Sequence, residues 1–168
     1  TLPVYVSLPE VAAHLWVLYG HTCVRAVSGN VYCWGGNFYG QLGNGLSGSD
    51  YPEDMALEAT PQLNPALSGA RQMSGGLWHT CAIQADGQLT CWGYGGHGAL
   101  GTGTTLEEAF PTPQPVSLPS PSVEVEAAGF FTTCARRKRT HCGTSRVYDS
   151  FPGLTTWWSI KPPNVPSK

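Results

Sequence analysis

The sequence predicts an all-β fold in which short antiparallel hairpins recur along the chain. Two stretches of equal length, HTCVRAVSGNVYCWG (His21 to Gly35) and HTCAIQADGQLTCWG (His79 to Gly93), share one pattern. Each consists of two β-prone runs on either side of a Gly-containing turn, which is the pattern of a β-hairpin. The 168 residues include 21 Gly and 14 Pro, and only 12% are charged. That composition is typical of a turn-rich β protein.

The second stretch has the clearest hairpin geometry. If its loop is Ala85-Asp86-Gly87, with the glycine in the left-handed conformation, Cys81 lies directly opposite Cys91. The matching pair in the first stretch is Cys23 and Cys33. Cβ atoms of opposed residues lie about 4.5–5.5 Å apart, close enough for a cross-strand disulfide at a non-hydrogen-bonded pair. We expect two hairpin-clamping disulfides, with free buried thiols as the alternative.

Each hairpin continues into a similar Gly-rich stretch, GGNFYGQLGNG (Gly35 to Gly45) or GYGGHGALGTG (Gly93 to Gly103). The offset between the two copies is 58 residues. A period of this length, made of short strands and Gly-rich turns, is typical of β-propeller blades. We expect the repeated positions to be structural: His21, Gly29, Trp34, Gly35, Gly40, Gly43, His79, Gly87, Trp92, Gly93, Gly98 and Gly101.

The motif resembles the repeat of the regulator of chromosome condensation family over about residues 1–135. Blades of that family read roughly as an AxG run, HTC, DG, CWG and NxxGQLGxG, and many of these spaced positions match in both copies. The resemblance implies four-stranded antiparallel blades in a closed ring of about seven. This chain would then form an incomplete propeller arc of about two and a half blades, with an irregular C-terminal tail.

The expected blades occupy about residues 1–60 and 61–116, with a partial third at 117–135. Pro3-Val4-Tyr5-Val6 resembles the outer strand of a preceding blade. Ala12 to Tyr19 is apolar enough for a buried inner strand, although periodicity does not exclude a short helix. Within it, Leu18 replaces a glycine (Gly76 in the second copy, Gly129 in the third), so we expect strain or a displaced strand there.

The remaining segments follow in order. Leu67 to Gly76 and Val123 to Gly129 are the expected inner strands of the second and third blades. Ser47 to Pro65, with its four acidic residues, and Thr102 to Ser122 are interpreted as connectors. We favour a solvated loop over an acidic binding patch for the first of them. Phe130 to Cys134 opens a third hairpin.

The repeat then stops, and residues 136–168 form a basic, Pro-containing tail. The second cysteine of a third copy would fall at position 144, where the sequence has Thr144; Cys142 comes too early, so the pairing of Cys134 and Cys142 stays open. Residues up to Ala135 have two basic against ten acidic side chains, whereas the tail has seven against one. We interpret the tail as a degenerate cap or as the product of a shifted frame or retained intron.

Neither a metal site nor a catalytic site emerges from the motifs. Zinc motifs place two ligands about two to four residues apart, whereas HxC is followed here by nine residues before the next cysteine. His21 and His79 are acid/base candidates by type, but their recurrence favours a ring packed or hydrogen-bonded within each blade. Trp34 and Trp92 likewise suit blade cores. The GxGxxG match at Gly93 to Gly98 lacks the helix that a nucleotide site needs. We predict no catalytic residue, metal or cofactor.

The function expected from the resemblance is a non-catalytic protein-interaction module, a fragment of a larger propeller. The alternative is a guanine-nucleotide exchange factor for a small GTPase such as Ran. The acidic repeats argue against nucleic acid, and Arg136 to Arg139 reads as a solvated run rather than a nuclear-localisation or phosphate-binding cluster. No stretch is apolar enough to span a membrane. We expect association with remaining blades or with itself, and an extracellular or cell-surface location if the cysteines pair, with a cytoplasmic or nuclear one as the alternative.

Overall fold

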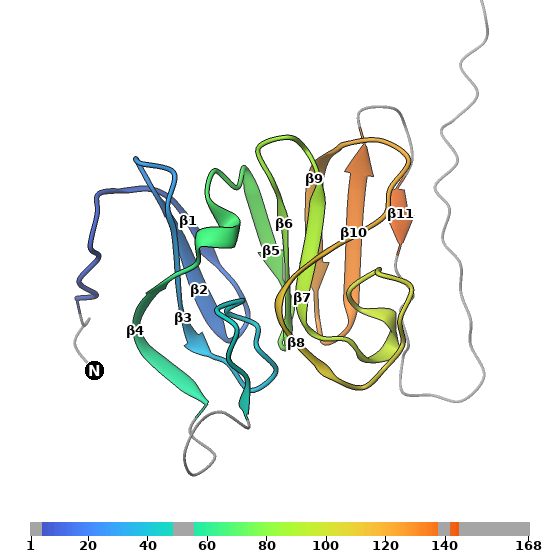
Figure 1. The fold of residues 1–168 in the computed structure, drawn as a ribbon, viewed down its shortest axis with the longest axis horizontal. Helices are drawn as coiled ribbons and strands as arrows, with labels where there is room; N and C mark the ends of the chain where they lie inside the picture. The colour runs from blue at the N-terminus through green and yellow to red at the C-terminus, as the bar shows by residue number, and fades with distance from the viewer. Residues whose placement is uncertain (1–4, 49–55, 138–141, 145–168) are drawn as a thin grey trace, which may run out of the picture.

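Three antiparallel sheets follow one another along the chain in a computed structural model, which describes residues 5–48, 56–137 and 142–144 (Figure 1). We call them blades 1, 2 and 3. Blade 1 contains β1 (Ala12–Val17), β2 (His21–Ala26), β3 (Val31–Gly36) and β4 (Leu57–Leu63). Blade 2 contains β5 (Gln72–Gly75), β6 (His79–Ile83), β7 (Leu89–Tyr94) and β8 (Ala109–Pro115). Blade 3 contains β9 (Ser122–Ala128), β10 (Thr132–Arg137) and β11 (Cys142–Thr144).

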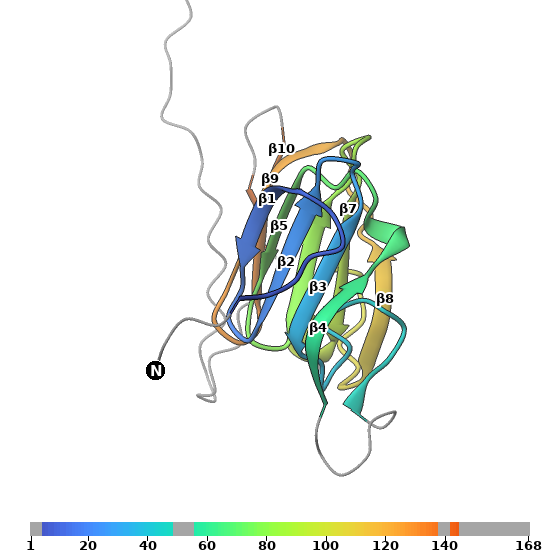
Figure 2. The same ribbon diagram turned by 90° about the vertical axis from the view of Figure 1, so that its left-hand side faces the viewer.

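Each sheet is a simple up-and-down ribbon in which sequential strands are neighbours. Figure 2 views the stack from the side of blade 1, with the other two blades behind it. Two short 3-10 turns, η2 (Pro65–Leu67) and η3 (Gly96–Gly98), lie wholly within the described residues. The arrangement is the arc of all-β blades that the sequence predicts.

The register of the central hairpins is the predicted one. In blade 2, Cys81 pairs with Cys91 and Ile83 with Leu89, and Gly87 in the three-residue loop has a φ of 90°. A side chain there would be strained, because only glycine adopts this conformation without steric cost. Blade 1 pairs Cys23 with Cys33 in the same way. A local pattern of β-prone runs and one turn glycine therefore determines the central pair of strands.

The fourth strands lie inside the segments that the sequence analysis treated as connectors. β4 falls within 47–65 and β8 within 102–122, so the connector interpretation is wrong for these residues. β8 has the sequence AFPTPQP, with prolines at every second position: Pro111, Pro113 and Pro115. Alternate residues of a strand direct their N–H groups to the same side, so the prolines fit the outward side of an edge strand. Neither strand has alternating hydrophobic and polar residues, so the sequence pattern did not predict them.

The first inner strand is a strand, but the expectation that it is buried is wrong. Of the six residues of β1, only Trp16 is buried. The side chain of Trp34 in β3 is also partly exposed. Trp92, at the equivalent position of blade 2, has no exposed surface. Within the described residues, no sheet covers this outer face of blade 1. Tyr5, expected in an outer strand, lies outside any strand and is almost fully exposed.

Leu18 replaces a repeat glycine without backbone strain. Its φ is not positive, and its N–H donates to the carbonyl of His21 within the β1–β2 turn. The glycine matters in blade 2, because a Cβ at Gly76 would lie 2.6 Å from the carbonyl oxygen of Gly129. The close approach is a contact between blades 2 and 3. Strain at Leu18 was therefore a wrong expectation.

The third hairpin continues beyond the point where the motif is lost. β11 pairs antiparallel with β10, and Thr144 lies opposite Cys134, the position taken by a cysteine in the other hairpins. Backbone pairing needs neither the second cysteine nor the CWG motif. Arg136, Arg137 and Cys142–Thr144, which the sequence analysis assigned to the tail, therefore belong to strands of blade 3. The interpretation of the tail as a cap or frame-shift product falls on residues outside those described.

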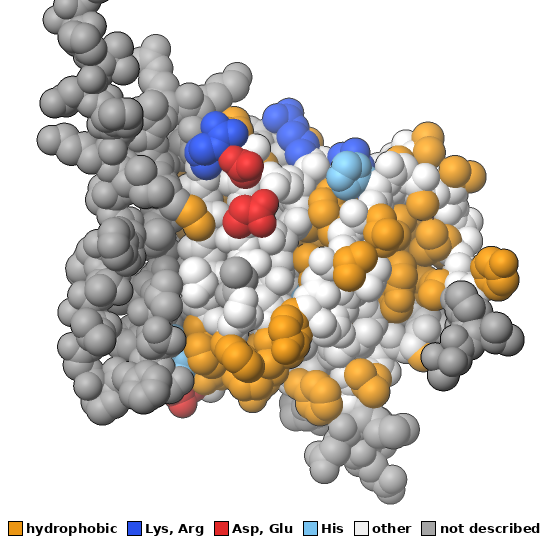
Figure 3. Space-filling view, turned by 180° about the vertical axis from the view of Figure 1, so that it is seen from behind, with side chains coloured by type: hydrophobic (Ala, Val, Ile, Leu, Met, Phe, Trp, Pro, Cys, Tyr) orange, Lys and Arg blue, Asp and Glu red, His pale blue; other side chains and the backbone are white. Residues whose placement is uncertain are grey.

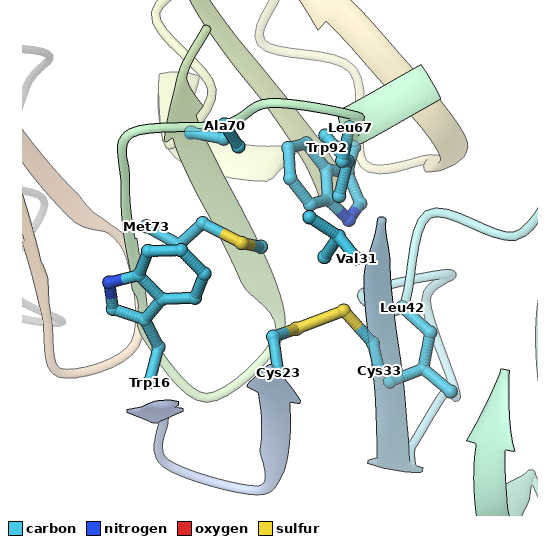
Figure 4. Close-up of a cluster of buried hydrophobic side chains, with 10 residues drawn as sticks. Trp16, Cys23, Val31, Cys33, Leu42, Leu67, Ala70, Met73 and Trp92 are labelled. Carbon is cyan, nitrogen blue, oxygen red and sulfur yellow. A yellow bond between two sulfur atoms is a disulfide. The ribbon is translucent and has the colours of Figure 1, made fainter. Parts of the chain in front are cut away.

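The apolar core lies between adjacent sheets (Figure 4). One cluster joins blade 1, through Trp16 and the Cys23–Cys33 pair, to Met73 and Trp92 of blade 2. A second cluster joins the other face of blade 2 to blade 3: Cys81, Ile83, Leu89, Cys91, Leu100, Val116, Val125 and Ala135. The blades are thus held face to face, and each interface depends on both neighbours.

Candidate interaction surface

The repeated histidine hydrogen-bonds the next blade, not its own as predicted. His21 of blade 1 lies with Nε2 2.7 Å from Oγ1 of Thr80 in blade 2, and that hydroxyl donates to the carbonyl oxygen of Gln41 at 2.7 Å. Because the hydroxyl has one proton, Nε2 of His21 is the donor to Oγ1. The same carbonyl also accepts Nε1–H of Trp92 at 2.9 Å. Blade 2 thus donates twice to one backbone group of blade 1.

Blade 2 repeats the arrangement towards blade 3. Nε2 of His79 lies 2.9 Å from Oγ1 of Thr133, which donates to the carbonyl of Ala99 at 3.0 Å. Burial lowers the pKa of His79 to about 4, and burial followed by the charge of His79 lowers the pKa of His21 to about 3. Among the described residues, Nδ1 of His21 is buried without a hydrogen-bond partner, whereas backbone groups of Thr132 and Phe130 act on the ring of His79. These rings are neutral at physiological pH and inaccessible to a substrate, which suits a structural role.

The repeated glycines adopt the left-handed backbone conformation. Positive φ angles occur at Gly29, Gly35, Gly40, Gly43, Gly87, Gly93, Gly98 and Gly101. At Gly93, a Cβ would lie 2.3 Å from the carbonyl oxygen of Trp78, so the chain approaches too closely for any side chain. The Gly-rich GxGxxG match therefore forms a tight exit from β7, and its last three residues are the 3-10 turn η3.

Both hairpins carry a disulfide within their central strands. Cys23 is bonded to Cys33 and Cys81 to Cys91, each across a Cα–Cα distance of 4.1 Å. All four side chains are fully buried. No cysteine whose side chain the structure describes is a free thiol. Each disulfide faces the next blade and forms part of an inter-blade core, so it stabilises both its hairpin and the packing surface.

A cluster of aromatic side chains gathers at one end of the blades, where the inner hairpins begin. We call it the aromatic face and define it by the residues Tyr39, Trp78, Tyr94, His97, Phe130 and Phe131. Trp78 lies in the β5–β6 turn, Phe130 and Phe131 in the β9–β10 turn, and Tyr39 in the exit from β3. All three blades therefore contribute to one surface.

Trp78 lies at the centre of the aromatic face. Its ring centroid is 5.2 Å from Tyr39, 5.7 Å from Tyr94 and 5.6 Å from Phe131. These rings are only partly buried, and Phe130 is 52% exposed. In Figure 3 one band of apolar side chains lies along the lower edge, further apolar side chains spread over the right-hand half, and the Lys and Arg side chains lie along the upper edge. Partly exposed, mutually packed rings of this kind are typical of protein-binding surfaces.

Comparison of the two copies did not reveal the aromatic face. Trp78 corresponds to Gly20 in the first copy and to Phe131 in the third, so the ring does not recur in both good repeats. The available signal was the pair of aromatic residues, Trp78 and Phe131, each directly before the first position of the HTC motif. Only the stacking of blades brings these turns together.

No other site chemistry emerges from the part of the chain that the structure describes. His, Cys, Asp and Glu residues form no group of three or more that could hold a metal ion there. In the same residues, no helix is long and apolar enough to cross a membrane.

Comparison with known proteins agrees with the repeat pattern. The family model of the regulator of chromosome condensation (RCC1) repeat matches residues 28–83 and 86–135, and a second model of the same repeat matches 70–99. The ultraviolet-B receptor UVR8 of Arabidopsis thaliana is 37% identical over 93 residues, covering 54% of this chain and 19% of the receptor. The secretion-regulating guanine nucleotide exchange factor of Mus musculus is 30% identical over 139 residues, covering 71% of this chain and 30% of that protein.

Solved structures share the fold. Human WBSCR16 superposes with a TM-score of 0.71 at 17% identity, covering 93% of this chain and 39% of that one. Yeast RCC1 (Prp20), in its complex with Kap60, gives a TM-score of 0.67 at 18% identity, covering 79% and 31%. This chain thus spans less than two fifths of each of these proteins. With the repeat model matching two consecutive segments over more than half of its length, the chain belongs to the RCC1 repeat family.

Proposed function

We propose that this chain is a non-catalytic protein-interaction module of RCC1-repeat type that binds its partner through the aromatic face. The observation that carries the proposal is the cluster around Trp78, to which three blades contribute. Trp and Tyr are enriched among residues that dominate binding energy, because they bury a large area at a low cost in conformational entropy. The sheets below supply a rigid support for these turns.

The test is a comparison of two variants of the full chain in affinity capture. Trp78→Ala removes the central ring, and Val27→Ala, at an exposed turn at the other end of blade 1, is the matched control. We expect Trp78→Ala to reduce partner recovery about tenfold or more, as loss of a hot-spot ring does. Both variants should keep their disulfides and a cooperative thermal transition, with a lower midpoint for Trp78→Ala because its half-buried ring packs against neighbouring rings. Equal recovery of the same partners by both variants would place binding elsewhere.

A second candidate function is guanine-nucleotide exchange on a small GTPase. It is favoured by the similarity to the secretion-regulating guanine nucleotide exchange factors of Bos taurus and Mus musculus, at 31% and 30% identity. This chain covers only 25% and 30% of those proteins, so their activity is a proposal here. Release of fluorescent GDP from a loaded small GTPase separates the candidates. An acceleration of release in the presence of the chain would favour exchange.

We also propose that the chain works in an oxidising compartment, at the cell surface or outside the cell. The support is the two buried cross-strand disulfides, since such bonds persist in secreted proteins and are rare in the cytosol. The cytoplasm or nucleus is the alternative. Alkylation of the protein from its native source, followed by peptide mapping, tests this. Alkylated thiols at all four positions would reject the oxidising compartment.

A further inference from the structure

The charges around the aromatic face indicate the chemistry of its partner, an inference that rests on the proposed function. We propose that the aromatic face binds a basic protein segment whose arginine side chains stack on Trp78 and Phe131 and pair with Glu107 and Glu108. The aromatic rings would supply the contact area and the two carboxylates the preference for positive charge.

The chain segment that contains both glutamates lies beside Tyr94 of the aromatic face. Glu107 and Glu108 are exposed in the segment that leads into β8, and the carbonyl of Glu108 accepts the N–H of Gly95 at 2.9 Å. This bond holds the segment against Tyr94, the neighbour of Gly95 in the chain. Burial first, and then the charge of Glu107, raises the pKa of Tyr94, so the carboxylate acts on the aromatic face directly. Leu106 adds an exposed apolar side chain to the same rim.

In the described residues, no lysine or arginine lies at this end of the blades. Arg25 and Arg71 lie at the opposite end, where Arg25 donates to the carbonyl of Ala70 at 2.7 Å. Arg136 pairs with Glu124, also away from the aromatic face. The described part of the chain therefore supplies no cation to neutralise Glu107 and Glu108. An incoming cation would meet a negative potential on a surface of low polarity.

Arginine suits this surface better than the other charged residues. Its guanidinium is planar, stacks on Trp, Tyr and Phe rings, and forms paired hydrogen bonds with a carboxylate. A lysine offers one point charge with stronger hydration, and an acidic segment would be repelled by the glutamates. A neutral apolar segment would gain the ring contacts but nothing from the carboxylates. The occupant that satisfies both features is a basic segment containing arginine.

The experiment uses the full chain and a phage-displayed library of random 12-residue peptides. Selection on the unmodified chain, with counter-selection on the Trp78→Ala variant, isolates sequences that need the aromatic face. We expect these sequences to be enriched in arginine. Affinities of one selected synthetic peptide are then measured by fluorescence anisotropy at low and high salt.

Matched variants distinguish an effect of the carboxylate charges on binding from an effect on folding. Glu107→Gln with Glu108→Gln removes both carboxylates from an exposed segment, and Asp86→Asn removes an exposed carboxylate at the opposite end. We expect the double variant to weaken binding about three- to tenfold and to flatten its salt dependence, with Asp86→Asn within about twofold of the parent. Replacing the peptide's arginines by glutamine should weaken binding by at least as much.

The outcomes distinguish this inference from the proposed function. Trp78-dependent peptides that are acidic or uncharged, or binding that is indifferent to Glu107 and Glu108, would overturn the basic partner and leave the interaction surface intact. If no selected peptide depends on Trp78, both proposals are overturned.

Discussion

At the scale of single residues, the buried histidines act as connections between blades. Each ring donates to a threonine of the following blade, which donates in turn to a backbone carbonyl of the preceding one. In a buried setting, removal of the ring leaves the threonine oxygen without its donor and opens a cavity. Each histidine therefore stabilises mainly the contact between two neighbouring blades.

We predict that His79→Ala lowers the free energy of unfolding by about 2–4 kcal/mol, the sum of a lost buried hydrogen bond and a cavity. Denaturant titration at pH 7 measures the change. A double-mutant cycle with Thr133→Val isolates the pair, because the two side chains lie on different blades. Additive effects of the two substitutions would contradict the connection, and His14→Ala on the exposed strand β1 is the control.

Stability should fall as the pH falls below about 6.5. The folded-state pKa values of His21 and His79, about 3 and about 4, lie below the ordinary value of 6.5. The unfolded chain therefore binds more protons in this window, and each histidine adds a slope of about 1.4 kcal/mol per pH unit. The loss grows until the pH passes the folded-state values. Stability that is constant between pH 6.5 and 5, where carboxylates stay ionised, would contradict this prediction.

Residue roles were predictable only where the two copies agree. Cys23, Gly29 and His21 recur with Cys81, Gly87 and His79, so the hairpin register and the left-handed turns follow from the local pattern. The partners of the histidines did not follow, because His21 and Thr80 are 59 residues apart and meet only when blades stack. The aromatic face was hidden for the same reason.

At the scale of elements, the disulfide of each hairpin lies on the surface that meets the next blade. Closing a loop of about ten residues contributes roughly 2–3 kcal/mol in the chain-entropy model. We predict that Cys81→Ala with Cys91→Ala lowers stability by that amount plus a packing loss, because both sulfurs lie in the core shared with blade 3. Thermal unfolding of the oxidised parent and the double variant measures it. An unchanged midpoint would mean that the bond contributes nothing.

The sequence predicted the strands that have β-prone residues and a turn glycine. It did not predict the strands that form only because they pair with a neighbouring strand. The inner hairpins carry β-prone runs and a turn glycine, whereas β8 contains prolines at alternate positions and β4 one proline. Such strands form because a preceding strand offers a free edge, which a single-sequence pattern does not record. β11 is a similar case, since it pairs with β10 although Thr144 lies opposite Cys134, where the other hairpins have their second cysteine.

At the scale of the whole molecule, the outer face of blade 1 matches the face by which blade 2 packs on blade 1. Leu15 lies opposite Val24 as Met73 lies opposite Ala82, and Met73 is 3% exposed whereas Leu15 is 58% exposed. Blade 1 covers Met73, whereas no sheet of the described residues covers Leu15. This face has the composition of an interface core without a covering blade in the described part of the chain.

We predict that the isolated chain self-associates through this face. Leu15→Glu should shift sedimentation velocity profiles towards the monomer with little change in stability, since the side chain is exposed. Met73→Glu, at the equivalent buried position, should instead destabilise the fold strongly. Trp78→Ala serves as the control for association through the aromatic face. A monomer at every concentration of the unmodified chain would contradict the prediction.

The alternate prolines of β8 determine what kind of assembly such association gives. Pro111, Pro113 and Pro115 have no N–H, so the outer edge of blade 2 offers an incoming strand almost no donors. Growth by edge-to-edge addition, the route to amyloid-like ribbons, is therefore blocked at this rim. At this rim we therefore expect copies to associate through sheet faces, not through strand edges. Concentrated samples should accordingly yield soluble, finite oligomers and not fibrils.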